Sequence, residues 1–367
     1  MGTLSGAPFI QTAPTDQYAA PGSSATFTVS ASGSSTLTYQ WNFNGAPIGG
    51  ATGSSYTISN VQASNGGPYT VTVTDTDGST TSGVATLYVS SGSSGARLIN
   101  ISTRAMVGTG GNILIPGFVI GGSGTESLLI RADGPALTQF GVSGALAAPS
   151  LTVINSAGTT VASNTGWGTN PNPSQIASVA AQVGAFALAS GSADCALIAN
   201  LGPGSYTVQV SGVGNTTGVA LAEIYEVSST GTARLINIST RALVGTGANI
   251  LIPGFVIGGT GTEQLLVRGD GPALTQFGVS GALAAPSLGV YNGTGTEIAS
   301  NIGWGTSTTP VPSQIASVAA FVGAFPLTAN SADCAQVVNL TPGAYTIQIS
   351  GVSSTSGVAL AEVYEVP

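Results

Sequence analysis

The only charged side chains in this sequence are carboxylates and arginines, because the chain has no lysine and no histidine. It carries fourteen Asp and Glu residues and six arginines among 367 residues, with a formal net charge of -8. Without histidine the chain lacks the most frequent general base and the commonest metal ligand. A carboxylate pair, as in glycoside hydrolysis, is the most reasonable acid–base chemistry that remains.

Ten of the fourteen carboxylates occur in two matched sets, each accompanied by three arginines. The first set is Glu126, Asp133, Asp194, Glu223 and Glu226 with Arg97, Arg104 and Arg131; the second is Glu263, Asp270, Asp333, Glu362 and Glu365 with Arg234, Arg241 and Arg268. In a chain so poor in charge, equal copies of both signs favour fixed ion pairs that orient loops or join domains. Glu223 and Glu226, near a strand end, are interpreted as part of a solvated face. We therefore expect no catalytic residue, no metal site and no cofactor.

Two short motifs have familiar sequences. Arg268, Gly269 and Asp270 form the tripeptide known for integrin recognition, but the first copy has Arg-Ala-Asp at 131–133, so we interpret the match as accidental. Residues 75–78 (DTDG) begin like a calcium loop but lack its third acidic position and its distal Glu. Between two β-runs, Asp-Gly predicts a hairpin turn.

Cys195 and Cys334 occupy matching positions in the two sets, so neither has a partner within its own copy. One interpretation is a small apolar residue in a strand. The other is an assembly contact through an intermolecular disulfide, because Leu197 on the same strand face is replaced by Gln336 in the second copy.

Trp167 and Trp304 lie in matching Gly-rich loops, each with the sequence GWGT. Such a ring either packs its loop onto the protein or stacks on a sugar. The second use is the one feature that supports carbohydrate binding.

The last two thirds of the chain is a tandem duplication. ARLINISTRAMVGTGGNILIPGFVIGG, from Ala96, returns with two changes from Ala233, and residues 133–151 recur unchanged at 270–288. The sequence therefore predicts domains at 1–89, 96–227 and 233–367, with linkers at 90–95 and 228–232.

Each repeat contains eight short β-runs, which suit a two-sheet sandwich of the jelly-roll type. One helix is expected in each repeat, over 174–183 and 313–322, with Ser174 as its cap and Gly184 at its end. We expect this helix to lie across an open end or edge of the sandwich.

The first unit alternates short strands and turns, and its core positions have characteristic spacings. Trp41 follows Val29 by 12 residues, and Tyr69 precedes Val71 by two. On these residues the unit resembles the disulfide-free immunoglobulin-like domains of bacterial surface proteins, with the two valines where the inter-sheet cysteines would stand. The resemblance implies that all four residues belong to the structural core.

The repeats carry GPGSYTVQVSG at 202–212 and GVALAEIYEV at 218–227. These phrases are similar to β-sandwich repeats of very large secreted bacterial proteins, which implies surface exposure. The predicted fold is thus all-β, with three β-sandwich domains in tandem: one Ig-like, then two jelly-roll-like repeats with one short helix each.

An acidic chain without clustered Lys and Arg is not expected to bind nucleic acid or anionic membranes. No apolar run reaches the ~18 residues of a membrane span. No signal peptide is visible, and we interpret the chain as a mature form or a fragment of a longer precursor. Its location is predicted as secreted or cell-surface.

The expected function is that of a non-catalytic extracellular structural or adhesive protein that self-assembles into a homopolymeric fibre or surface layer. Sheet edges without lysine lack a common protection against strand pairing. Phe9 and Ile10 either complete their own sandwich or are donated to a neighbouring copy. The alternative is a carbohydrate-binding accessory region of a larger secreted enzyme, with polysaccharide as partner.

Overall fold

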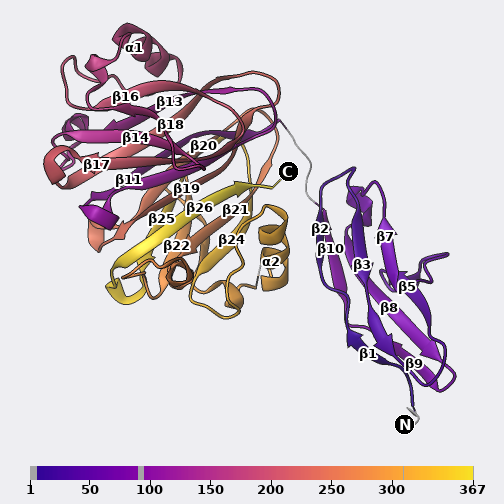
Figure 1. The fold of residues 1–367 in the computed structure, drawn as a ribbon. Coiled ribbons are helices and arrows are strands. Elements are labelled where there is room, and N and C mark those ends of the chain that lie inside the picture. Colours follow the sequence, from indigo (N-terminus) through magenta and orange to yellow (C-terminus); the bar gives the residue numbers. More distant parts are fainter. Residues whose placement is uncertain (1–5, 90–94, 309, 367) are drawn as a thin grey trace. The chain divides into compact units, whose positions relative to one another are not determined.

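The protein is described from a computed structural model that covers residues 6–89, 95–308 and 310–366 (Figure 1). It contains an N-terminal domain and a larger unit formed by the two repeats, and each is described by itself. The predicted linker at 90–95 lies outside the described residues except for Gly95.

The N-terminal domain consists of short strands in three sheets. Its strands are β1 (Phe9–Thr12), β2 (Gln17–Ala19), β3 (Ala25–Thr28), β4 (Ser30–Ser32), β5 (Thr38–Phe43), β6 (Ala46–Pro47), β7 (Ser55–Ile58), β8 (Gly67–Asp75), β9 (Gly78–Thr81) and β10 (Ala85–Val89). The main sheet has the order β2-β10-β8-β5-β6, with β9 on β8, while β3 pairs with β7 and β1 with β4. Tyr69, Val71 and Val73 alternate along β8 and face the core, as the two-residue period of a strand requires.

The first repeat forms the eight strands that its sequence predicts. They are β11 (Arg97–Val107), β12 (Ile115–Gly121), β13 (Glu126–Asp133), β14 (Pro149–Asn155), β15 (Thr160–Asn164), β16 (Cys195–Leu201), β17 (Gly204–Gly212) and β18 (Gly218–Ser229). The second repeat has the same eight: β19 (Arg234–Val244), β20 (Ile252–Gly258), β21 (Glu263–Asp270), β22 (Pro286–Asn292), β23 (Glu297–Asn301), β24 (Cys334–Leu340), β25 (Gly343–Gly351) and β26 (Gly357–Glu365). The all-β class and the sandwich arrangement are confirmed.

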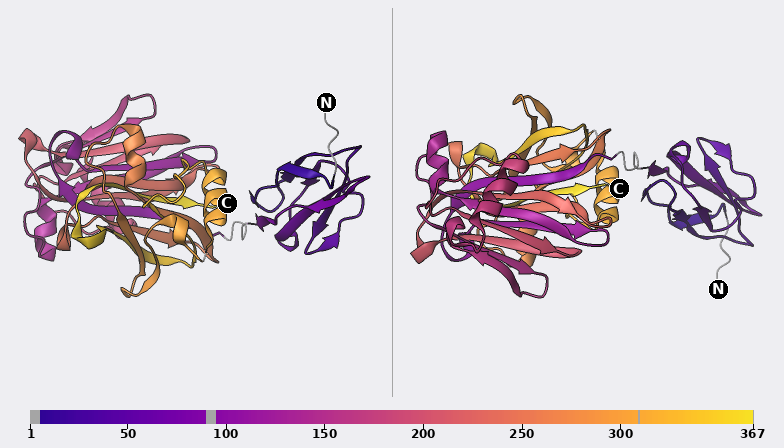
Figure 2. Two further views of the ribbon diagram at one scale, coloured as in Figure 1. Left: turned by 90° about the horizontal axis from the view of Figure 1, so that it is seen from below. Right: turned by 90° about the horizontal axis from the view of Figure 1, so that it is seen from above.

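The two repeats share their sheets. One eight-stranded sheet has the order β16-β13-β18-β11-β20-β25-β22-β23, and the other has the order β15-β14-β17-β12-β19-β26-β21-β24. In each sheet the first four strands come from one repeat and the last four from the other, so the junctions are β11–β20 and β12–β19. Figure 2 shows the magenta strands of the first repeat and the orange to yellow strands of the second within one body. One hydrophobic core, which runs from Ala96 to Val363, includes residues of both repeats.

At the centre of this double sandwich, matching residues meet. Thr103 of β11 and Thr240 of β19 are both buried, and their Oγ1 atoms lie 2.8 Å apart in a hydrogen bond. Gly117 faces Ser239 and Gly254 faces Ser102 across the junctions; a Cβ on either glycine would lie 2.8 Å from the serine Oγ. The absence of a side chain at each glycine therefore leaves room for the serine that faces it on the neighbouring strand.

Shared sheets correct the prediction of two separate sandwiches joined by a linker at 228–232. Strand β18 continues to Ser229, and the backbone N–H groups of Thr230 and Thr232 donate to the carbonyls of Thr125 and Ser123 at 2.8 and 2.9 Å. This segment is a hydrogen-bonded corner because the strand on each side of it belongs to a different sheet.

Helices α1 (Pro173–Gln182) and α2 (Pro312–Phe321) occur where one helix per repeat was predicted. Asn172, not Ser174, caps α1: its side chain accepts from the backbone N–H of Gln175, and Pro173 occupies the first helical position. Gly184, with φ of +77°, follows the end of α1 as predicted. Ile176 and Ala180 of α1 pack on Leu129 and Ala196, so this helix covers the outer face of β13 and β16 and not a sheet edge.

Nine short 3-10 helices complete the described residues. They are η1 (Ala63–Asn65), η2 (Gly110–Asn112), η3 (Pro135–Phe140), η4 (Trp167–Thr169), η5 (Val213–Asn215), η6 (Gly247–Asn249), η7 (Pro272–Phe277), η8 (Trp304–Thr306) and η9 (Val352–Ser354). No helix among the residues that the structure describes has the length and apolar character needed to cross a lipid bilayer.

Candidate functional site

A buried arginine lies at the centre of each repeat's outer sheet face. Strand β13 directs Leu128 and Ile130 to the core, so Arg131 and Asp133 face the opposite way. Arg131 is paired across the ladder with Glu223 of β18. Its Nη2 lies 3.0 Å from Asp133 Oδ2, and its Nε lies 3.4 Å from Glu223 Oε2.

Aromatic residues complete this cluster. The Tyr225 hydroxyl donates to Glu223 Oε1 at 2.7 Å. Arg131 Nη1 donates to the Phe186 carbonyl at 2.8 Å, and its guanidinium carbon lies 4.2 Å from the centre of the Phe186 ring. This is a cation–π contact in addition to the ion pairs.

The second repeat reproduces the arrangement. Arg268 lies 3.1 Å from Asp270 and 3.4 Å from Glu362, and the Tyr364 hydroxyl donates to Glu362 at 2.7 Å. Arg268 and Asp270 are at most 1% exposed. The Arg-Gly-Asp sequence therefore cannot be reached by a receptor, in agreement with its interpretation as an accidental match.

Burial controls the protonation of these clusters. It raises the pKa of Asp133 and of Asp270 well above the ordinary value, partly offset by the neighbouring arginine and reinforced by the negative charge of Glu223 or Glu362. Asp133 and Asp270 lie within ion-pair distance of Arg131 and Arg268, and all four side chains are sealed from solvent. General acid–base catalysis needs contact with a substrate proton, and these carboxyl groups offer no such access.

A second pair of clusters lies near the β11–β20 and β12–β19 junctions. Arg97 pairs with Glu226, and Arg234 Nε lies 3.3 Å from Glu365 Oε2. The backbone N–H of Leu98 in the first repeat donates to Glu365 Oε1 of the second at 2.7 Å. The ion pairs thus orient strands at the junction of the repeats. The interpretation of Glu223 and Glu226 as a solvated face is wrong, because Glu223 is buried and the Glu226 side chain is only 5% exposed.

Two further glutamates are buried beside these pairs. Burial, followed by the charge of Glu226, raises the pKa of Glu126 to about 7, and neither carboxyl oxygen has a hydrogen-bond partner. Burial, followed by the charge of Glu365, raises the pKa of Glu263 to about 8. Burial also raises the pKa of Glu365 to about 7.

Asp194 and Asp333 orient a loop. Asp194 Oδ1 accepts from the backbone N–H groups of Gly134 and Ala136 at 2.7 and 3.2 Å, at the start of η3. Asp333 makes the equivalent contacts with Gly271 and Ala273. Within residues 6–89, 95–308 and 310–366, no group of three or more Cys, Asp or Glu side chains is arranged to hold a metal ion.

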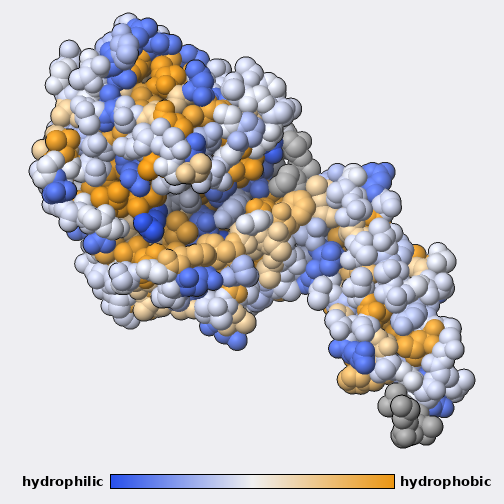
Figure 3. All heavy atoms as spheres, in the orientation of Figure 1, coloured by the Kyte–Doolittle hydropathy of each residue, from blue (hydrophilic) through white to orange (hydrophobic). Residues whose placement is uncertain are grey.

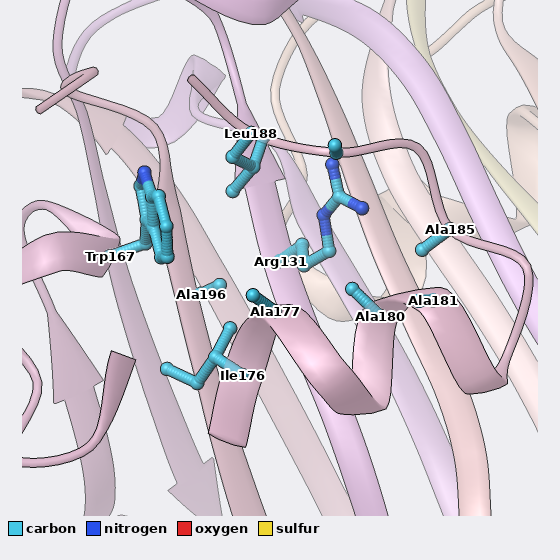
Figure 4. A pocket seen from close by; sticks show the side chains of 10 residues that line it. Arg131, Trp167, Ile176, Ala177, Ala180, Ala181, Ala185, Leu188 and Ala196 are labelled. Atoms are coloured by element: carbon cyan, nitrogen blue, oxygen red, sulfur yellow. The ribbon is translucent and has the colours of Figure 1, made fainter. Parts of the chain in front are cut away.

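The two candidate sugar-stacking tryptophans have different surroundings. Trp167 is half-buried and lines a cavity of about 80 Å³ between α1 and Arg131, where Ile176, Ala180 and Leu188 also point (Figure 4). Trp167 Nε1 donates to the Ala189 carbonyl at 3.1 Å, so the indole is bonded to its own loop region. Trp304 is 8% exposed, and its Nε1 donates to the Thr328 carbonyl at 3.1 Å, which corrects its interpretation as a sugar platform.

Both cysteines are free and fully buried. The Cys195 thiol donates to the carbonyls of Pro149 and Asn164 at 3.0 and 3.2 Å, and Cys334 makes the equivalent contacts. Burial raises the pKa of each thiol to about 11. An intermolecular disulfide needs an accessible thiolate, so their assignment as assembly contacts is wrong.

In the N-terminal domain, Val29, Trp41, Tyr69 and Val71 are buried in one cluster. The Tyr69 hydroxyl donates to the Asn65 carbonyl at 2.9 Å. This bond to the backbone a few residues upstream is the tyrosine corner of immunoglobulin-like domains.

Two other predictions concern the edge and a turn of this domain. Phe9 and Ile10 pair with Ser32 and Ala31 of β4, so within this chain β1 completes its own sandwich. Asp75 Oδ1 accepts from the backbone N–H of Asp77 at 2.8 Å between β8 and β9, which makes residues 75–78 a hairpin turn.

Sequence reasoning missed a groove on the outer face of β22, β23 and β25. Its distinctive residues are Gly289, Tyr291 and Glu297, with Gln348 on the neighbouring strand. The signal was present in the sequence, because the first repeat has Thr152, Ile154 and Thr160 at the first three positions.

Comparison with known proteins identifies one part of the chain. Residues 7–75 match the family model for the immunoglobulin domain. No curated protein matches the chain.

Several solved structures resemble the same part. The tandem Ig repeats of Dlar are 22% identical, with 24% of this chain and 50% of that chain covered and a TM-score of 0.23. Extracellular domains 3–5 of Drosophila OTK are 18% identical, with 23% of this chain and 32% of that chain covered and a TM-score of 0.21. Titin M4 is 22% identical, with 24% of this chain and 100% of that chain covered and a TM-score of 0.22. At these TM-scores the likeness carries no argument about the rest of the chain.

Proposed function

We propose that this protein is a non-catalytic structural or adhesive component of a bacterial cell surface and that it self-associates into a fibre or layer. An immunoglobulin-like domain beside a duplicated β-sandwich fits such a role, because domains of this kind are common in adhesion and structural proteins. The likeness of the repeats to those of large secreted proteins supports an extracellular location.

The distribution of charge is the observation that carries the proposal. Two of the six arginines and nine of the fourteen carboxylates are buried, which leaves four arginines and five carboxylates closer to the surface. The buried ones are Glu126, Arg131, Asp133, Asp194, Glu223, Glu263, Arg268, Asp270, Asp333, Glu362 and Glu365. The formal charge of -8 thus lies mainly inside the double sandwich.

The surface of the protein carries few charged side chains. Residues of intermediate hydropathy cover much of the face seen in Figure 3. Copies of the protein that meet therefore bring few like-charged side chains into contact.

The outer edge strands β15 and β23 are the proposed contacts. Each ends one of the eight-stranded sheets, and Val161 of β15 and Ile298 of β23 occupy matching positions and are 41% and 42% exposed. An edge strand with an exposed apolar residue and no lysine can pair with another chain.

The test is the mass of the pure protein by light scattering over a range of concentrations, with electron microscopy of the same samples. The full chain is expected to form oligomers or filaments, and Val161→Lys with Ile298→Lys should return it to a monomer. A matched control is Phe140→Lys with Phe277→Lys, which adds the same charge at exposed positions away from the edges. A monomeric wild-type chain at high concentration, or equal loss of association in the control, would contradict the proposed assembly.

A further inference from the structure

Strands β22 and β25, labelled in Figure 1, belong with β23 to one eight-stranded sheet, and the groove lies on the outer face of these three strands. Gly289 of β22 is opposite Ser300 of β23 on one side and Gln348 of β25 on the other. Ser287 is opposite Ser350 one step along the same face. Together with Tyr291 and Glu297 they line an open hollow of about 420 Å³.

Gly289 determines where the aromatic ring of this groove lies. A Cβ at this position would be 2.8 Å from Cε2 of Tyr291 and 3.0 Å from its hydroxyl oxygen. The Tyr291 ring therefore occupies the space of the missing side chain and lies across the strand, a packing that stabilises a glycine within a sheet. Tyr291 remains half-buried.

Glu297 fixes the position of this ring. It accepts a hydrogen bond from the Tyr291 hydroxyl at 2.9 Å. Hydrogen bonds from Ser300 and from Tyr291 lower the pKa of the Glu297 carboxyl, so it is charged at neutral pH and available as an acceptor.

The first repeat provides an internal comparison. Its matching face has Thr152, Ile154 and Thr160 in place of the glycine, the tyrosine and the glutamate. Ser150, Gln209 and Ser211 are the same as Ser287, Gln348 and Ser350. Ile302 also lines the groove, where the first repeat has Thr165. The four differences thus bring a ring, the space beneath it, a charged acceptor and an apolar side chain to one place on an otherwise shared polar face.

We propose that this groove binds a neutral saccharide chain. The C–H face of a pyranose ring packs on an aromatic surface, while its hydroxyl groups bond to the Gln, Ser and Glu side chains around it. Apolar contact surrounded by a few placed polar groups is what small-ligand sites generally offer. The open hollow suits a chain that continues past the ring, and the negative charge of Glu297 disfavours an acidic sugar. This inference goes beyond self-association and does not depend on it.

The test is calorimetric titration of the full chain with three neutral probes: cellohexaose, laminarihexaose and chitohexaose. At least one is expected to bind with one site per chain, and tri-galacturonate should bind more weakly. Tyr291→Ala should weaken binding at least about tenfold, the effect expected for loss of an aromatic stacking partner. Ile154→Ala in the first repeat is the matched control and should leave binding unchanged.

A gain of function makes the test sharper. The quadruple variant Thr152→Gly, Ile154→Tyr, Thr160→Glu and Thr165→Ile builds the same groove in the first repeat, so the number of sites per chain should rise from one to two. Unchanged melting of each variant shows that the fold is retained. The proposal is overturned if none of the neutral probes binds at millimolar concentration, if Tyr291→Ala binds as well as the wild type, or if the acidic sugar binds best.

Discussion

The two repeats have nearly the same sequence and the same strands, yet they differ on their outer faces. Their buried parts agree closely: Arg131 lies 3.4 Å from Glu223, and Arg268 lies 3.4 Å from Glu362. Residues at the junction must satisfy both repeats at once, as where Thr103 bonds to Thr240. A change there would disturb two sandwiches, whereas a change on an outer face affects only its own repeat.

The loops around the two tryptophans and the polar groove on β22, β23 and β25 are places where the two repeats differ. Ser331 accepts from Trp304 Nε1 and donates to Asp333 at 2.7 Å, while the matching Ser192 hydroxyl has no hydrogen-bond partner. Tyr291 occupies the position of Ile154. Duplication has therefore kept most of the core, although the buried Leu197 is replaced by the buried Gln336, and it has let one repeat acquire surface features that the other lacks.

The largest expected effect comes from separating the repeats. A fragment of residues 233–367 leaves the junction edges of β19 and β20 unpaired, so two copies should pair β19 with β20 of the other in a two-fold dimer. Mass by sedimentation should show this dimer. Gly254→Val, which places a side chain against the facing serine, should weaken it; a folded, monomeric wild-type fragment would show that the junction is not self-complementary.

The next effect compares the buried arginines. Arg131→Met and Arg268→Met each leave a glutamate buried without its partner, so each should cost about 3 to 5 kcal/mol of unfolding free energy. The costs should be nearly equal, because the two clusters have the same geometry. Denaturant melting measures them. Arg97→Met, at a side chain 35% exposed, should cost no more than about 1 kcal/mol.

Unlike the two arginine substitutions, the two tryptophan substitutions should lower the free energy of unfolding by different amounts. Trp304→Ala removes a ring that is 8% exposed and should cost about 3 to 5 kcal/mol. Trp167→Ala removes a half-buried ring beside an existing cavity and should cost roughly half as much. Equal costs in denaturant melting would mean that the two loops are packed alike.

The smallest effect is a dependence of stability on pH. In the folded protein the pKa values of Glu126 and Glu263 are about 7 and about 8, above the ordinary value of 4.5. Between pH 4.5 and these raised values, the folded state therefore binds more protons than the unfolded state. Stability from these groups is therefore complete below pH 4.5 and is lost as pH rises toward 8.

Replacing the carboxyl by a neutral amide tests this dependence. Since each unit of pKa difference is worth about 1.4 kcal/mol, and relaxation reduces it, Glu263→Gln should gain about 1 to 2 kcal/mol at pH 8 relative to wild type. Glu126→Gln should gain less, and neither should gain at pH 4. A wild-type double sandwich that melts at a higher temperature at pH 8 than at pH 5 would contradict the sign.

The sequence by itself determined the local elements and the nature of the charged residues. Two-residue alternation and turn residues specified all eight strands of each repeat, and the spacing of Trp41 and Tyr69 specified the immunoglobulin-like core. The recurrence of the same acids and arginines in both repeats indicated ion pairs, which the structure places at Arg97, Arg131, Arg234 and Arg268.

Only the tertiary structure decided which strands are neighbours. Alternation tells which side of a strand is buried, but the backbone edges of β11 and β12 carry the same groups whether they pair within a repeat or with β20 and β19. The burial of Trp304, the sealed thiols and the groove over Gly289 depend in turn on elements distant in sequence. Periodicity reports the environment of one strand at a time, and these features arise from several strands packed together.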